Sequence, residues 1–467
     1  MPRGREGHAR RLMSRSMKCS ARAVGQAPEI MADRDGFARI ARVVASETTV
    51  LPFPPLLLAV ALASAASLAG WLALLLHPAR PWDLQPSDDL AAPDPEPWPR
   101  VVAIVPARNE ASSLPRTLPA LLSQDLPGGL LVILVEDRSE DGTGAVAARI
   151  ARELGLESRL RVVIGAELPQ GWLGKPWALE QGARAALQGD GATLPGFLLL
   201  TDADILHAPG TVKRLVAECV HLGVGLDSRM ALLRCRSRAE RLLVPAFDFF
   251  FAALYPMRRV NDARSTVAAA AGGCVLIDVE ALRSVGGFSC IRDRVIDDVS
   301  LARAVKAAGH RLHLARSRGA VSSLRDYEDL GSLWRMVRRS AFTELRHSWV
   351  RLAACLAALC VAFVAPTAAA LAALAWQGPA ALSARCLTGF LAGSATAVMA
   401  HVYRPALGSH GLPAWRALTL PLAGILYGAM TLDSAMRHAL GRPESWRARP
   451  EATSTPQPEA ARGGAKR

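Results

Sequence analysis

Long apolar runs near the ends of the chain enclose a middle part in which short apolar runs alternate with polar motifs. The run at 51–76 has roughly 25 residues without a charge, enough to cross a hydrocarbon core of about 30 Å. Three more long runs follow at 352–376, 380–403 and 412–432, and Asp433 directly follows the last. This pattern predicts one N-terminal transmembrane helix and two to three C-terminal ones.

The short runs of the middle part predict buried strands. They lie at 101–105, 130–135 and 197–201, and polar motifs follow each of them. The segments between them, 111–124 and 143–154, have apolar residues at helical spacing and predict helices. The order strand, helix, strand, helix, strand predicts a doubly wound α/β sheet. Ligands in such sheets bind beyond the carboxyl ends of the strands, where these polar motifs lie.

Changes in composition divide the chain into segments. Aromatic and aliphatic side chains with a basic face at 333–350 are typical of a helix at a membrane interface, although an amphipathic core helix has the same spacing. The Pro- and Asp-rich stretch before residue 100 is typical of an extended tether. The predicted segments are a disordered basic tail or start-site artefact at 1–49, a transmembrane helix at 50–77, a linker at 78–99, an α/β domain at 100–332, the interfacial helix at 333–350, two to three transmembrane helices at 351–436 and a disordered basic tail at 437–467.

Charge and cysteine content exclude other classes of protein. The net charge is +14, but the basic residues gather at the ends and beside the apolar runs, without the interleaved aromatics of a nucleic-acid site. Anionic lipid headgroups explain them better, so we expect a membrane partner and no nucleic acid. The eight cysteines form no CxxC pair and have no histidine at zinc spacing, which argues against a disulfide framework or a zinc site.

Polar motifs follow the first two predicted strands. The first reads PARNE and contributes Pro106, Arg108 and Glu110, and the second places Asp137 before a glycine-containing turn. A carboxylate at a strand end can accept the N–H of a nucleobase and the hydroxyls of a ribose. Taken alone, the first motif is equally compatible with a turn and a helix cap, and the second with a solvated turn.

Two carboxylates follow the third predicted strand in a D-x-D arrangement. On extended backbone Asp202 and Asp204 project the same way, so they can converge on one hard cation and its bound diphosphate. The predicted cofactor is Mg²⁺ or Mn²⁺. A solvated loop is the alternative for an isolated D-x-D, because the tripeptide is common on protein surfaces.

A second acidic pair, Asp297 and Asp298, opens a predicted helix whose packing face includes Val299 and Leu301. Carboxylates at a helix start are favoured by the helix dipole and can be simple capping groups. The functional interpretation is a general base that removes the proton of an acceptor hydroxyl as its oxygen attacks an anomeric carbon.

The four motifs in this order resemble family 2 glycosyltransferases with a GT-A fold, over about residues 100–350. The resemblance implies a GT-A-type doubly wound mixed sheet, an inverting reaction and a nucleotide-diphosphate sugar as donor. It also implies site roles for the motif residues. These are nucleotide binding by the strand-one motif (Pro106, Arg108, Glu110) and Asp137, donor and metal binding by Asp202 and Asp204, and base catalysis by Asp298 with Asp297 beside it.

More narrowly, the segments at 105–110, 174–178 and 334–339 resemble the hopanoid-biosynthesis-associated subgroup of that family. In related members the Gly-Lys segment lies near the donor, so Lys175 can offset diphosphate charge, and a surface lysine in a loop is the alternative. Where processive synthases carry Q-x-x-R-W, this chain keeps only Arg338. Arg338 is predicted to meet the departing diphosphate, although a juxtamembrane arginine on lipid phosphate explains it equally well.

The predicted function is sugar transfer to a lipid-borne acceptor at the cytosolic face of the inner membrane, because nucleotide sugars are cytosolic. Arg-rich tails conflict with this orientation if four spans are present, and a re-entrant last helix removes part of that conflict. The alternatives are a polyprenyl-phosphate or other glycolipid glycosyltransferase, a sugar-phosphate nucleotidyltransferase and an inactive membrane scaffold. No Gly-rich basic phosphate loop follows 101–105, which argues against the nucleotidyltransferase.

Overall fold

The computed structural model describes residues 55–84, 92–188, 194–327, 329–375 and 382–441. The predicted tail at 1–49 lies outside the described residues, and so does most of the predicted tail at 437–467. The last helix extends to Ala439, beyond the boundary predicted at 436. The described parts of the predicted linker, 78–84 and 92–99, contain neither helix nor strand.

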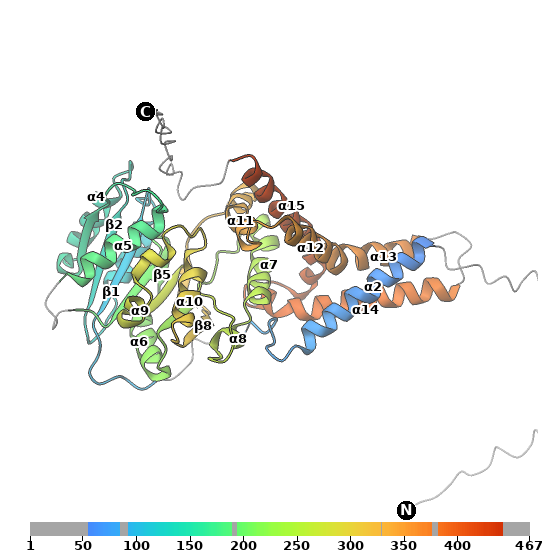
Figure 1. Cartoon of the computed structure of the whole chain (residues 1–467), viewed down its shortest axis with the longest axis horizontal. Helices are drawn as coiled ribbons and strands as arrows, with labels where there is room; N and C mark the ends of the chain where they lie inside the picture. The colour runs from blue at the N-terminus through green and yellow to red at the C-terminus, as the bar shows by residue number, and fades with distance from the viewer. Residues whose placement is uncertain (1–54, 85–91, 189–193, 328, 376–381, 442–467) are drawn as a thin grey trace, which may run out of the picture. The chain divides into compact units, whose positions relative to one another are not determined.

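A seven-stranded mixed sheet forms the centre of the α/β part (Figure 1), in the order β3-β2-β1-β4-β7-β6-β8. β3, β2, β1 and β4 run parallel, and β7 is antiparallel to both of its neighbours. The three predicted strands and the doubly wound sheet are confirmed. The sheet strands are β1 (Val101–Ala107), β2 (Leu130–Glu136), β3 (Leu160–Ile164), β4 (Phe197–Thr201), β6 (Leu226–Met230), β7 (Cys274–Asp278) and β8 (Leu312–Arg316).

Helices cover both faces of this sheet. Side chains of β1 alternate between two buried layers: Val102 and Ile104 face one, and Val101, Ala103 and Val105 face the other. Helices α5, α9 and α10 pack on the first layer, and α3, α4 and α6 on the second. The helices of this part are α3 (Leu114–Leu122), α4 (Thr143–Glu153), α5 (Gly174–Leu187), α6 (Thr211–Leu222), α7 (Arg238–Leu254), α8 (Met257–Asn261), α9 (Val279–Ser284) and α10 (Asp297–Ala307), with the short 3₁₀ turns η1 (Glu157–Arg159) and η3 (Gly287–Ile291).

The chain inserts β3 and α5 between the second predicted helix and the third predicted strand. β3 lies at the edge of the sheet, and its side chains are only partly buried, with Arg161 among them. It therefore lacks the continuous apolar run by which the central strands are predicted. The insertion matters for the site, because the first turn of α5 carries Lys175.

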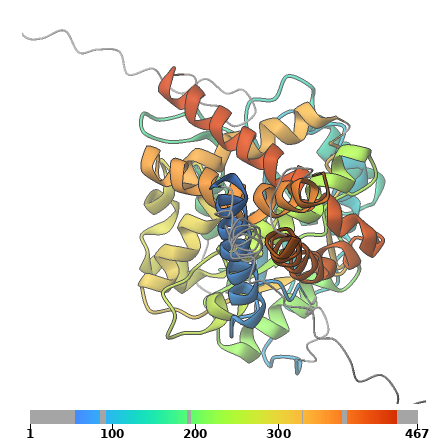
Figure 2. The ribbon, with the colours of Figure 1, turned by 90° about the vertical axis from the view of Figure 1, so that its right-hand side faces the viewer.

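The apolar helices near the two ends of the chain pack together, with the blue α2 among the orange C-terminal helices (Figure 1 and Figure 2). Within the described residues, three helical stretches are long and apolar enough to cross a membrane: Leu57–Leu76, Trp349–Ala375 and Leu382–Gly408. The helices of this part are α2 (Pro55–Leu76), α11 (Leu330–Glu344), α12 (Trp349–Leu359), the π-helical turn η4 (Cys360–Val364), α13 (Ala365–Ala375), α14 (Leu382–Gly408), the 3₁₀ turn η5 (Ala414–Thr419) and α15 (Leu420–Ala439).

The run predicted as a last span at 412–432 is divided between η5 and α15, and α15 is not among the candidate spans. Asp433 belongs to α15 and accepts a hydrogen bond from the Trp334 indole of α11 at 2.7 Å. This charged, paired group explains why α15 packs on protein. The described C-terminal part therefore has two candidate spans.

The helix predicted at the membrane interface, 333–350, is two helices. α11 ends at Glu344, and α12 begins at Trp349. The apolar side chains Leu333, Val337 and Phe342 of α11 are buried, and α11 packs against α15 and α7. Protein thus covers these side chains of α11, as the alternative of an amphipathic core helix expects, and the placement at a membrane interface stays a prediction.

Candidate active site

The carboxyl ends of β1 and β4 meet the first turns of α5 and α10 at one edge of the sheet. A small cavity there is lined by Pro106 of β1, Lys175 of α5, Asp202 after β4, and Asp297 and Asp298 of α10. The structure thus brings five of the residues predicted from the sequence to one place. Parallel strands explain this convergence, because their carboxyl ends share an edge.

The D-x-D segment turns as soon as β4 ends at Thr201, so it is not the extended backbone assumed from the sequence. The carbonyl of Asp202 accepts the Ile205 N–H at 3.1 Å, and the carbonyl of Asp204 accepts the Leu324 N–H at 2.9 Å. β5 (Ile205–His207) then pairs antiparallel with β9 (Val321–Ser323). These contacts fix the turn that presents both carboxylates.

Asp202 and Asp204 face different basic groups. An oxygen of Asp202 lies 2.9 Å from the Lys175 ammonium, and an oxygen of Asp204 lies 3.7 Å from the Arg325 guanidinium. Burial and the charge of Asp202 raise the pKa of Asp204, against the opposing effect of Arg325. The two carboxylates therefore repel each other, although their side chains contact different cations.

Lys175 connects the D-x-D segment to the second acidic pair. Its ammonium lies 3.4 Å from Asp297 as well as 2.9 Å from Asp202, and its side chain is only 17% exposed. Burial lowers the pKa of Lys175, but Asp202, Asp297 and Asp298 outweigh that effect and raise it, so the group stays charged. The surface lysine in a loop, left open by the sequence, does not fit this helical and largely buried position.

Asp298 has the environment of a proton acceptor. Burial and the neighbouring Asp297 raise its pKa to about 6, while Lys175 opposes the shift. The Val299 N–H donates to one of its oxygens at 2.7 Å, and the Gly272 N–H also donates to the carboxylate. A Cβ on Gly272 would lie 3.0 Å from the other oxygen, so a larger residue here would force the Asp298 carboxylate to shift.

The residues predicted to bind the nucleotide lie at the ends of β1 and β2. The Arg108 guanidinium donates to the Asp137 carbonyl at 3.2 Å and lies 3.9 Å from its carboxylate, which is fully buried. Glu110 is buried too, and its carboxylate accepts the Ser113 hydroxyl at 2.8 Å where α3 begins. The Ser113 and Leu114 N–H groups also donate to the Glu110 carbonyl, so the first motif forms a turn before α3, and the N-cap residue Ser113 makes no side-chain cap.

Arg338 is not part of this group. It lies on α11, and its guanidinium is 3.0 Å from the Asp433 carboxylate of α15. The structure therefore offers a protein carboxylate as its partner, where the sequence predicted a diphosphate.

The model of the family described as glycosyltransferase like family 2 matches residues 99–343, which is more than half of the 467 residues. The chain belongs to this family. This is a family of glycosyltransferases, and the predicted GT-A-type fold is confirmed.

Similarity to individual proteins is more limited. An N-acetylglucosaminyltransferase of Mesorhizobium japonicum is 30% identical over 198 residues, which are 41% of this chain and 42% of that protein. The chain therefore spans less than half the length of this relative. The mannosyltransferase PcManGT from Pyrobaculum calidifontis, solved in complex with GDP-Man and Mn²⁺, has 22% identity and a TM-score of 0.51, over 83% of this chain and 99% of that chain. Glucosyl-3-phosphoglycerate synthase from Mycobacterium tuberculosis, in complex with Mn²⁺, UDP and phosphoglyceric acid, has 18% identity and a TM-score of 0.35, over 54% of this chain and 78% of that chain. The likeness to PcManGT shows the shared fold.

The structure of this glycosyltransferase adds Arg325, which the sequence did not single out. Arg325 follows β9 and reaches Asp204 because β5 pairs with β9. The segment around it is anchored: the Tyr327 N–H donates to the Glu240 carboxylate at 3.2 Å, and Asp326 pairs with Arg234. No local motif marks Arg325, since strand pairing between distant segments brings it to the site.

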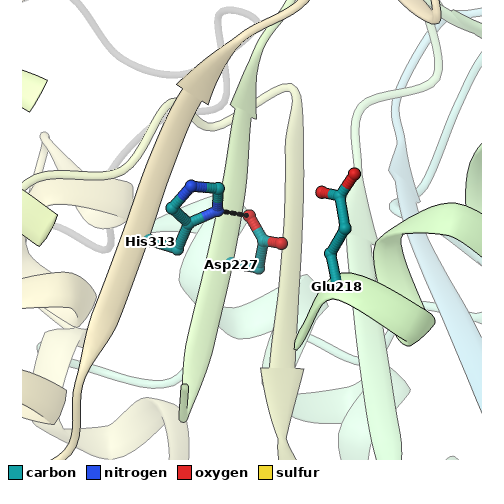
Figure 3. A group of neighbouring side chains, drawn as sticks. All are labelled: Glu218, Asp227 and His313. Atoms are coloured by element: carbon teal, nitrogen blue, oxygen red, sulfur yellow. Dashed lines mark hydrogen bonds and ion pairs between the residues drawn. The ribbon is translucent and has the colours of Figure 1, made fainter. Parts of the chain in front are cut away.

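Another cluster of acidic and histidine side chains has the spacing of a metal site (Figure 3). Ligand atoms of Glu218 on α6, Asp227 on β6 and His313 on β8 lie within 4.8 Å of one another. The Arg229 guanidinium also pairs with Glu218, and it lies 3.2 Å from both Asp227 and His313. A cation of the protein thus compensates these carboxylates, so we interpret the cluster as a buried ion-pair network.

Proposed function

We propose that this glycosyltransferase moves a sugar from a nucleotide-diphosphate sugar to a hydroxyl of a membrane lipid, with inversion at the anomeric carbon. The observation that carries the proposal is the carboxylate cluster, defined as Asp202, Asp204, Asp297 and Asp298, gathered at the strand ends with Lys175 between the two pairs. Such a cluster can bind a cation and a diphosphate on one side and accept a proton on the other.

The charges of the site fit one divalent cation, Mg²⁺ or Mn²⁺, held by Asp202 and Asp204. When ionised, the carboxylate cluster carries four negative charges, and Lys175 and Arg325 supply two positive ones. The two remaining negative charges are what one divalent cation neutralises, and carboxylate oxygens are the ligands that these metals prefer. Mutual repulsion of Asp202 and Asp204 also favours a cation there. When bound, the cation stabilises negative charge on the leaving diphosphate.

The donor is proposed to lie across the ends of β1, β2 and β4. Asp137 recognises the nucleoside, supported by its position at the end of β2 and by its contact with Arg108. Pro106 lines the floor of the site. Lys175 and Arg325 meet the diphosphate oxygens once the bound cation compensates their present carboxylate partners. Glu110 acts indirectly, by holding the start of α3.

Asp298 is proposed as the general base. The proton of the acceptor hydroxyl moves to the Asp298 carboxylate as the hydroxyl oxygen bonds to the anomeric carbon. The bond from that carbon to the diphosphate oxygen breaks, and the nucleoside diphosphate leaves with the electron pair. A single displacement inverts the anomeric centre. A pKa of about 6 suits a base that works near neutral pH, and the backbone N–H groups of Gly272 and Val299 hold the Asp298 carboxylate in place.

The lipid acceptor and the membrane location are supported by the apolar helices. Large side chains of the candidate spans face outward, with Leu62 62%, Phe390 69% and Leu374 81% exposed, as is typical of lipid-facing positions. α11 leads from the catalytic domain almost directly into the span that begins at Trp349. The catalytic domain is proposed to lie at the cytosolic face of the inner membrane, because nucleotide sugars are cytosolic. The motif resemblance favours a hopanoid-type acceptor over a polyprenyl phosphate.

The proposal is tested with detergent-solubilised protein, UDP- and GDP-sugars and Mn²⁺, by measuring donor hydrolysis, transfer and nucleotide binding. Asp204→Asn is expected to lose metal-dependent donor binding. Asp298→Asn is expected to keep donor binding but to lose about 10²- to 10⁴-fold in kcat. Asp125→Asn, which removes an exposed carboxylate outside the site, is the matched control and should behave as wild type.

An inactive membrane scaffold makes the opposite prediction. In that case the wild-type protein binds no nucleotide sugar of any base, with or without metal, and the proposal fails. Binding without transfer to any lipid would refute only the acceptor class.

A further inference from the structure

A second cavity lies among the apolar helices and shares no lining residue with the active site. It has a volume of about 340 Å³, and Trp82, His401, Arg404 and Leu412 help to line it. Trp82 follows α2, while His401 and Arg404 belong to the last turns of α14. Both helices are candidate spans, so the cavity lies where two spans end.

These ends face the catalytic domain. Tyr403 of α14 and Trp71 of α2 both contact Phe249 of α7, with ring centroids 5.6 and 6.2 Å apart. His410, just beyond α14, bonds Asp248 of α7 at 2.8 Å. If the membrane placement proposed above holds, on which this inference rests, the cavity lies at the level of the cytosolic headgroups.

The lining combines an indole with basic groups. The Trp82 indole donates to the Leu75 carbonyl at 3.1 Å, which fixes the ring beside His401. Arg80 lies over the same ring, and its neighbour Asp83 pairs with it and with Arg258. Tryptophan is enriched at membrane interfaces, where basic side chains meet lipid phosphates.

Arg404 is the basic group of the cavity that is available to bind a ligand. Its side chain is exposed, and among the residues that the structure describes it has neither a hydrogen bond nor an ion pair. A guanidinium can bind a phosphate through two parallel hydrogen bonds. The exposed Phe390 lies about three helical turns before His401 on the same face of α14, so a large apolar side chain lies on the bilayer side of the cavity.

We propose that this cavity binds the headgroup of an anionic phospholipid. Arg404 and His401 contact the phosphate, Trp82 packs beside the glycerol region, and the acyl chains follow α14 past Phe390. The exposed Phe390 on the same side of α14 favours a lipid over a free phosphate ion, because a soluble ion would not use an apolar side chain.

The test compares wild-type protein with Arg404→Gln and with the matched control Arg351→Gln, which removes another exposed arginine at the start of α12. Each protein is equilibrated with equal amounts of phosphatidylglycerol and phosphatidylcholine of the same acyl chains, and the retained lipids are counted by native mass spectrometry. Wild type and Arg351→Gln should retain phosphatidylglycerol preferentially. Arg404→Gln should lose about tenfold of that preference. His401→Gln is a second variant in case Arg404→Gln is poorly folded.

Equal preference in wild type and Arg404→Gln would overturn the proposal, and so would equal retention of the two lipids by wild type. Displacement of the lipid by inorganic phosphate would assign the cavity to a soluble anion and would also overturn it. Nucleotide binding, measured on the same samples, and extraction of the protein from membranes by alkaline carbonate report on the proposed function. The two proposals can therefore fail separately.

Discussion

Replacing Arg325 with glutamine should change the affinities for metal and for nucleotide in opposite directions. In the structure Arg325 compensates Asp204 at 3.7 Å, the place proposed for the divalent cation. Without the guanidinium, the cation binds a carboxylate that has no competing positive charge. The proposed diphosphate, in contrast, loses one of its two basic partners. A residue that merely supported the fold would weaken both kinds of binding.

The size of each effect follows from the contact. At 3.7 Å and an effective dielectric constant of about 20, the Coulomb energy of such a pair is about 4 kcal/mol. The Arg325 side chain is 36% exposed, so solvent screening reduces the net value to about 1 kcal/mol. Mn²⁺ alone should therefore bind Arg325→Gln about fivefold more tightly. Loss of a charged hydrogen bond to the diphosphate should weaken nucleoside diphosphate binding by about 10- to 100-fold.

Mn²⁺ affinity is measured by electron paramagnetic resonance without nucleotide, and UDP and GDP affinities by calorimetry at saturating Mn²⁺. Arg325→Lys keeps the charge and should recover part of the nucleotide affinity. Arg335→Gln, an exposed arginine of α11, is the matched control and should change neither affinity. Weaker binding of both ligands, or an unchanged nucleotide affinity, would refute the assignment of Arg325. If Arg338→Gln alone weakened nucleotide binding, the assignment predicted from the sequence would stand instead.

Three further predictions follow from the site and its surroundings. Because the pKa of Asp298 is raised to about 6, the base is increasingly protonated below that pH. The value of kcat/KM should then fall about tenfold per pH unit on the acid side, and an acid limb near pH 4 would contradict the role of Asp298. Gly272→Ala places a Cβ 3.0 Å from the Asp298 carboxylate and should lower kcat by about 10- to 100-fold with nucleotide affinity kept. Gly319→Ala, where a Cβ meets nothing within 4 Å, should leave kcat unchanged, and equal rates in the two variants would refute the steric argument. Arg229→Met leaves Glu218 and Asp227 buried without their cation and should lower the free energy of unfolding by about 3 to 5 kcal/mol, measured by denaturant titration. The control is Arg283→Met, which removes an exposed arginine paired with Glu280 and should change the free energy of unfolding by less than about 0.5 kcal/mol. A similarly small loss in Arg229→Met would contradict the ion-pair interpretation.

The sequence predicted the parts of the site that follow directly from strand ends. Asp202 follows β4, and Asp297 and Asp298 open α10; the apolar spacing of both elements is clear, and α10 packs on the face of the sheet so that its first turn meets the end of β4. The extended conformation predicted for the D-x-D segment was wrong. Side chains alternate in direction only while the backbone stays extended, and β4 ends at Thr201. The structure places Lys175 beside Asp202 and Asp297, but the sequence analysis predicted neither its helix α5 nor the edge strand β3 before it.

Arg325 and Arg338 show that a sequence pattern cannot predict which carboxylate an arginine contacts through tertiary packing. Both are arginines in a basic part of the chain, and their neighbours along the sequence do not tell which one faces the carboxylates. The difference comes from pairing between distant segments: β5 with β9 places Arg325 beside Asp204, and α11 with α15 places Arg338 beside Asp433. A motif predicts contacts within a few residues, whereas these contacts depend on tertiary packing.

The same limit applies to the apolar faces of α11 and α15. A stripe of apolar residues at helical spacing needs a nonaqueous partner, but lipid and protein satisfy that need equally, so hydropathy cannot choose between them. The polar groups in those helices decide the matter. Asp433 within α15 is costly against lipid and is instead paired with Trp334 and Arg338 of α11, which requires that the two helices pack together. The candidate spans contain no acidic residue, so their exposed leucines and phenylalanine remain available to the bilayer.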